Sequence, residues 1–118
     1  MVTILPMPRE VLLPLCEATG LSAPGMVWGY VAAEKQEMAG YCVVAEPDTP
    51  SGPCRILTLD AEDKFIADGL LRRALHPFYE EGYAEYTFDL PPDTTMLPDY
   101  IIIGNGSLSK LFKPCPAN

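Results

Sequence analysis

One segment of the chain, residues 54 to 90, reads as a β-strand, an α-helix and a second β-strand in succession. Arg55–Leu59 is a short run rich in β-forming apolar residues, and Ala84–Leu90 alternates between polar and apolar residues. Between them, apolar side chains recur at helical spacing from Ala67 to Glu81. Two strands joined in this way are expected to lie parallel, connected right-handedly by a helix that packs on the sheet. This unit restricts the chain to folds that contain a parallel strand pair.

The sequence before this unit predicts a strand, a helix and a hairpin. The strand is Val2–Leu5, and the helix spans residues 8 to 19. Pro14 should kink or divide that helix, because proline lacks the N–H and clashes with the preceding turn. The hairpin joins Val27–Glu34 to Ala39–Glu46 in antiparallel order.

After the unit, the chain predicts one more strand and a short helix. Tyr100–Ile103 is the strand, residues 104 to 106 form a turn, and Ser107 caps a helix that ends at Phe112. The order combines an antiparallel hairpin with a parallel crossover. We therefore expect an α+β (mixed α/β) fold in a single domain over residues 1–118.

The composition argues against several classes of partner. The formal net charge of −8 disfavours nucleic acid and anionic membranes, since both bind positive protein surfaces. No apolar run reaches the ~18 residues needed to cross a bilayer, and the residues after Met1 do not resemble a signal peptide. We therefore expect a cytoplasmic protein.

The cysteines and the histidine carry little catalytic signal. The four cysteines form no C-x-x-C pair, so the sequence predicts free thiols and no metal site. The single histidine, His76, leaves little material for a Ser-His-Asp or Cys-His hydrolase.

Three segments resemble the GNAT superfamily of N-acetyltransferases, within about residues 26 to 112. They are the hairpin segment Glu37–Val43, the strand Ile56–Leu59 and the helix start Ile66–Leu71. In that family, the strand leads into a pyrophosphate-binding loop of pattern Gln/Arg-x-x-Gly-x-Gly/Ala, followed by small residues and Leu-Leu. The resemblance implies a GNAT-like fold with a central mixed sheet, and acetyl-CoA as co-substrate.

The aligned loop, residues 62 to 67, departs from the family pattern. Only Ala67 keeps it, while Phe65 stands where the family has a glycine that lets backbone N–H groups approach phosphate. Glu62 replaces a basic or amide residue, and Lys64 is the one basic residue of the turn. The resemblance thus implies weak acetyl-CoA binding by a set of seven residues: Leu57, Leu59, Glu62, Lys64, Phe65, Ala67 and Gly69.

The same turn has a purely structural interpretation. Asp63 would cap the helix while Phe65 and Ile66 pack beneath it. Gly69 would then mark a close contact between helix and sheet rather than room for a ligand.

The catalytic groups follow from the resemblance. Transfer in this family is a direct attack of an amine on the thioester, with a base for the ammonium and often a tyrosine for the leaving thiolate. Tyr100 is the candidate acid, and the candidate bases are the carboxylates that end predicted strands: Glu34, Asp60 and Glu46. Trp28 and Tyr30 share a strand face, where they either line an acceptor cleft or cover the sheet.

Two functions remain open from the sequence. The first is acyl-CoA-dependent N-acyl transfer, such as acetyl transfer to an amine of a small molecule or a protein. The second is a noncatalytic GNAT-like module that binds a partner or forms a homodimer, with a degenerate coenzyme A loop. Neither hypothesis involves nucleic acid, membrane or metal.

Overall fold

The computed structural model of the protein describes residues 2–20, 26–47, 49, 51–89, 95, 97–98, 101 and 106–112. Within these residues, one sheet has the strand order β1-β2-β3-β4-β5-β6, and every neighbouring pair is antiparallel except β4–β5. The strands are β1 (Val2–Pro6), β2 (Val27–Glu34), β3 (Glu37–Ala45), β4 (Cys54–Ala61), β5 (Glu85–Phe88) and β6 (Gly106–Ser107). The helices are α1 (Arg9–Thr19), α2 (Lys64–Glu80) and α3 (Leu108–Leu111).

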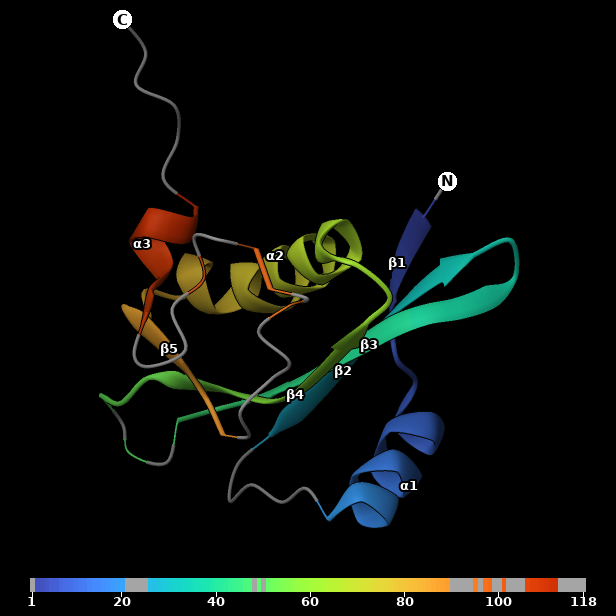
Figure 1. The fold of residues 1–118 in the computed structure, drawn as a ribbon. Helices are drawn as coiled ribbons and strands as arrows, with labels where there is room; N and C mark the ends of the chain where they lie inside the picture. Colours follow the sequence, from blue (N-terminus) through green and yellow to red (C-terminus); the bar gives the residue numbers. More distant parts are fainter. Residues whose placement is uncertain are drawn as a thin grey trace, which may run out of the picture.

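The sheet separates two helical layers. Helix α2 lies across one face, with α3 beside it, and α1 lies on the other face (Figure 1). The main core cluster fills the space between α2 and the sheet. A smaller cluster lies under α1 and consists of Leu12, Val43, Ala45 and Leu57. We call these two sides the α2 face and the α1 face.

The predicted strand, helix and strand unit is confirmed. Strands β4 and β5 are parallel neighbours, with α2 connecting them. The apolar stripe of α2 faces the sheet as predicted, and its members are all 5% exposed or less: Leu70, Leu71, Ala74, Leu75 and Phe78. The helix begins at Lys64, three residues before the predicted start, because the Asp63 carboxylate caps it.

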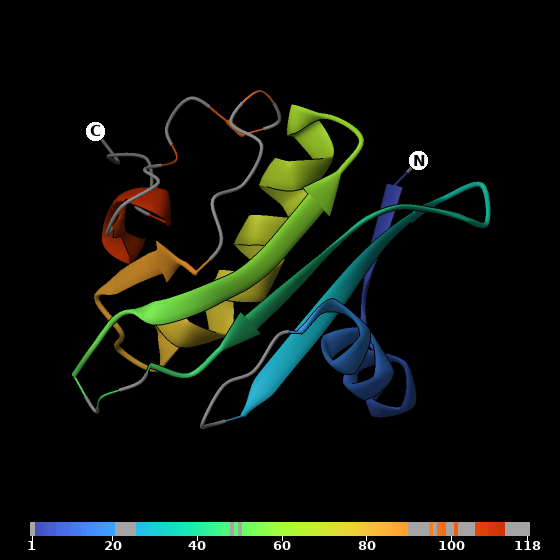
Figure 2. The same ribbon diagram turned by 60° about the horizontal axis from the view of Figure 1, so that its bottom comes forward.

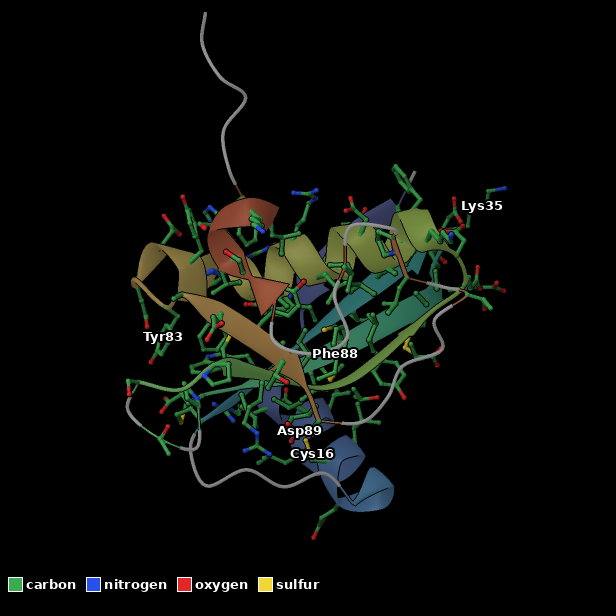
Figure 3. All side chains as sticks on the ribbon, turned by 60° about the vertical axis from the view of Figure 1, so that its left-hand side comes forward. Cys16, Lys35, Tyr83, Phe88 and Asp89 are labelled. Atoms are coloured by element: carbon green, nitrogen blue, oxygen red, sulfur yellow. The ribbon has the colours of Figure 1, made fainter. Side chains whose placement is uncertain are left out.

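The hairpin turn is tighter than predicted. Lys35 and Gln36 both have positive φ, 53° and 68°. Two left-handed residues in succession are typical of two-residue hairpin turns, whose twist matches that of the strands. Strand β3 therefore begins at Glu37, and Figure 3 shows Lys35 at the tip of the hairpin.

Pro14 does not divide α1, so this part of the prediction was wrong. The helix runs from Arg9 to Thr19 with Pro14 inside it. Pro14 removes the donor for the carbonyl of Glu10, and both residues are exposed, so water can bond that carbonyl instead. The Gly20 cap, at φ 71°, ends the helix as predicted.

The strand beside β5 is also not where the sequence placed it. Strand β6 begins at Gly106, in the predicted turn, whereas Ile101 lies in no strand and donates its N–H to the Pro98 carbonyl at 3.1 Å. The Tyr86 ring occupies the space that a side chain at position 106 would need, so a glycine there allows this pairing. The other residues of the predicted strand at 100–103 lie outside the described residues. Ser107 precedes α3 as predicted, although its hydroxyl contacts Ser109 rather than capping the helix.

Candidate functional site

The pairing of β4 with β5 ends midway along β4. They pair at three positions, ending at Ile56 opposite Phe88, and the Asp89 N–H then donates to the Ile56 carbonyl at 2.9 Å. Strand β4 continues to Ala61, where no strand in the described part of the chain accompanies it on this side (Figure 2). Strand β4 therefore extends beyond its last pair with β5, toward the end of the sheet where α2 begins.

An ion pair joins the two strands where their pairing ends. The Arg55 guanidinium makes two hydrogen bonds to the Asp89 carboxylate, the one from Nε to Oδ1 at 3.1 Å. Both side chains are largely buried, at 13% and 27% exposure. A bidentate pair of this kind fixes the geometry of both partners. Figure 3 labels Phe88 and Asp89 at the end of β5.

Strand β4 carries a bulge at the same level. Val43 lies opposite Thr58 and Val44 opposite Ile56, so Leu57 is an extra residue in the β3–β4 pairing. The extra residue shifts the alternation of side chains by one. Ile56 and Leu59 consequently both face α2, while Leu57 faces α1 and is 1% exposed. The two predicted cofactor-binding leucines of β4 therefore point to opposite faces.

The turn before α2 contains acidic residues, and one of them, Asp63, caps the helix. Asp63 Oδ1 accepts a hydrogen bond from the Ile66 N–H at 2.9 Å, and the Glu62 N–H donates to the Ala39 carbonyl at 3.0 Å. The first of these is a donor that an anion would use at a helix start. Glu62 and Lys64 are exposed.

The remaining predicted binding residues divide between surface and core. Phe65 is 78% exposed, so it does not pack beneath the helix as the structural interpretation required, whereas Ile66 and Ala67 are buried. At Gly69, an added Cβ would lie 2.8 Å from Ile4 Cδ1. This glycine lets α2 approach β1 closely, which agrees with the packing interpretation.

The candidate bases lie in three different places. Glu34 and Asp60 lie at the same end of the sheet, because β2 and β4 run in the same direction and both residues come near the carboxyl end of their strand. The alternation along each strand puts Glu34 on the α2 face with Ala32, and Asp60 on the α1 face. Glu46 follows β3 at the opposite end of the sheet, where its N–H donates to the Met26 carbonyl at 3.2 Å. Tyr100, the candidate acid, lies outside the described residues.

Tyr41 is a candidate that sequence reasoning missed. It lies opposite Asp60 in the β3–β4 register and packs at the edge of the α1-face cluster, so the phenol and the carboxylate share one face. Asp60 is exposed and Tyr41 partly buried. The β2–β3 hairpin pairs Tyr41 with Val31, so it gives no signal for Asp60, and the β3–β4 register depends on the bulge at Leu57.

The described cysteines are free thiols, as predicted, and they are not activated. Burial raises the pKa of Cys42 and of Cys54 to about 12. Burial also raises the pKa of Cys16, against a smaller lowering effect from Arg9. Cys115 lies outside the described residues. Low thiolate content makes these three poor nucleophiles at neutral pH.

The described residues contain no cluster of three or more His, Cys, Asp or Glu side chains placed to hold a metal ion. Among the described helices, none is long and apolar enough to cross a membrane.

Trp28 and Tyr30 share the α2 face of β2, as predicted. They line a hollow with the second half of α2, and β3 separates their strand from β4. They are therefore not at the place where the pairing of β4 and β5 ends.

Comparison with known proteins identifies the fold. No protein-family model matches the chain, and no curated protein matches its sequence. The structure is similar to a GNAT-family protein of Desulfovibrio desulfuricans that is described provisionally as an acetyltransferase, with a TM-score of 0.53 and 18% sequence identity. The match covers 73% of this chain and 71% of that one. The chain thus has a GNAT-like α+β fold, as predicted.

Proposed function

We propose that the protein binds an acyl-coenzyme A, acetyl-CoA in the simplest case, between β4 and β5 and transfers the acyl group to an amine. The observation that supports this most strongly is that the β4–β5 pairing ends at Ile56, next to the bulge at Leu57, while β4 continues to Ala61. Beyond Ile56, the amide-containing arm of coenzyme A would take the place beside β4 that β5 leaves. The start of α2, at the carboxyl end of β4, would receive the diphosphate.

The proposed chemistry is direct transfer. The amine nitrogen bonds to the thioester carbonyl carbon, the carbon–sulfur bond breaks, and the coenzyme A thiolate accepts a proton. Asp60 is the proposed base, since it is exposed and follows the bulge on the α1 face. Tyr100 stays a predicted proton donor, and Tyr41, opposite Asp60, is a second candidate for that role.

We expect this binding to be weak. The Asp63 carboxylate already accepts from the Ile66 N–H, and exposed Glu62 adds negative charge beside the diphosphate position. Phe65, largely exposed, adds bulk where the family has glycine.

Titration calorimetry with acetyl-CoA tests the proposal. The double variant Phe65→Gly, Glu62→Arg should bind about tenfold more tightly than the natural chain, because it restores backbone access and one favourable charge contact. Lys64→Glu should abolish the remaining affinity. The matched control is Glu17→Arg, which makes the same charge change at an exposed position of α1. Equal affinity of the double variant and the natural chain would contradict this account of the turn.

The Asp63 cap also supports a second candidate, a noncatalytic GNAT-like module that binds a partner or forms a homodimer. In that case neither the natural chain nor the double variant binds acetyl-CoA. Sedimentation velocity over a range of protein concentrations would then measure self-association, and a strictly monomeric chain would exclude the homodimer.

A further inference from the structure

Between β2 and the second half of α2 lies a small hollow of about 170 Å³. Its walls are Trp28 and Tyr30 from β2, Ala74, Pro77 and Phe78 from α2, and Glu81 directly after the helix. The hollow forms because β1 pairs with β2 only as far as Tyr30, and because Ala74 presents little bulk to the sheet. Its first residue on α2, Ala74, lies eleven residues after the cap Asp63, which corresponds to ~16 Å of helix.

The aromatic rings form adjacent walls. Trp28 and Phe78 lie with their ring centroids 5.6 Å apart and their planes at 84°. Tyr30 adds a third ring, and the Arg73 guanidinium lies 5.2 Å from its centroid. Aromatic faces carry negative electrostatic potential and attract cations, most strongly at tryptophan. The Arg73 contact is a cation–π interaction already present at this site.

Apart from Arg73, the charged features around the hollow are negative. Glu81, an exposed acidic residue, lies at its wall. It also stands at the carboxyl end of α2, the negative end of the helix dipole, and the last turn of α2 contains no basic residue. The whole chain carries a formal net charge of −8. These features are independent of the ring geometry, and they also favour a positive ligand.

We propose that this hollow binds an alkylated ammonium group, the head of a quaternary or methylated amine. The hollow is smaller than the ~300 Å³ at which drug-sized pockets begin, so it suits the head group alone. A second hollow of about 390 Å³ also has Glu81 in its wall and is otherwise lined by Ser51, Gly52, Gly82, Tyr83 and Ala84. It provides space for the remainder of the ligand. This site goes beyond the proposed acyl transfer, because β3 separates it from β4.

Trp28 makes the proposal directly measurable. It is the only tryptophan of the chain, so intrinsic fluorescence reports on the hollow itself. Choline should change this fluorescence saturably, while its uncharged isostere 3,3-dimethyl-1-butanol should bind about tenfold more weakly. Equal responses to the two compounds, or no saturable response to choline, would overturn the proposal.

Variants separate charge from shape. Glu81→Gln should weaken choline binding about fivefold, and the matched control Glu17→Gln on α1 should leave it unchanged. Phe78→Leu keeps an apolar side chain but removes one ring, and it should weaken binding of choline more than binding of the isostere. If Glu81→Gln and Glu17→Gln bind choline equally well, the carboxylate has no role and the proposal fails.

A final comparison distinguishes the source of the ammonium group. A short peptide with trimethyllysine is titrated beside choline, with the unmodified lysine peptide as its control. Tighter binding of the trimethylated peptide would assign the site to a modified protein. Tighter binding of choline would assign it to a small molecule. Binding of the unmodified peptide as tight as that of the trimethylated one would contradict recognition of the alkylated group.

Discussion

The two faces of the sheet are built very differently. The α2 face buries an extended apolar cluster to which β2, β3, β4, β5, α2 and α3 all contribute. Among the described residues, the α1 face has only the small cluster of Leu12, Val43, Ala45 and Leu57, and its flanking residues Met7, Leu15 and Tyr41 are partly buried. Burial of apolar surface is the main favourable term in folding. The α2 face should therefore determine stability, while the α1 face tolerates change and carries Asp60 and Tyr41.

Truncation of one leucine on each face tests this difference. Leu71→Ala, at 0% exposure in the α2-face cluster, should cost about 4 kcal/mol of unfolding free energy. Leu12→Ala, at 1% exposure, should cost about 2 kcal/mol, because the smaller α1-face cluster can relax around the missing atoms. Urea denaturation of both variants measures the two values. A cost for Leu12→Ala that equals or exceeds that of Leu71→Ala would break the comparison.

The reactivity of the cysteines gives a second test of the difference between the α2 face and the α1 face. Cys42 and Cys54 belong to the α2-face cluster with pKa values of about 12, whereas Cys16 on α1 is partly exposed and its raised pKa is opposed by Arg9. At pH 8, roughly one in ten thousand of the buried thiols is ionised. Alkylation with iodoacetamide in a Cys115→Ser background should therefore modify Cys16 first. As pH rises toward 12, ionisation of the buried thiols increases, but their burial still limits access.

Peptide mass mapping after short alkylation identifies the modified thiol. The control is the same reaction in denaturant, where all three thiols should react. Modification of Cys42 before Cys16 in the folded protein would mean that the α2 face opens more readily than the α1 face.

The smallest effect is expected on the outer side of α2. The His76 side chain is 49% exposed, with its Nδ1 3.2 Å from Glu80 Oε1 and its ring packed edge-on against Phe112. His76→Ala should change the unfolding free energy by about 0.5 kcal/mol or less, because exposed pairs of this kind contribute little. Thermal unfolding checks this value, with Lys110→Ala as an exposed control. A loss above ~1.5 kcal/mol would place the outer side of α2 within the core.

Local patterns in the sequence predicted the elements that carry strong periodicity. The apolar stripe of α2 and the antiparallel hairpin were predicted correctly, since each depends on neighbouring residues along the chain. The predictions at one proline and one glycine were less accurate. Pro14 remains inside α1 because its exposed surroundings allow water to replace the lost bond. Gly106 can pair with β5 because it has no side chain to clash with the Tyr86 ring. Both outcomes depend on what surrounds the residue, which no local pattern contains.

The candidate site divides in the same way. The sequence by itself determined the parallel crossover, the acidic turn at Glu62–Ala67 and the aromatic pair Trp28 and Tyr30, because spacing and residue type specify these features. Only the tertiary structure decided that Leu57 is a bulge, that Asp60 lies beside Tyr41, and that the aromatic pair meets Phe78 and Glu81 across a hollow. Each of these depends on which strand or helix packs opposite a residue. That choice is made by the burial of the whole core and by the register between strands, which the chain settles only when it folds.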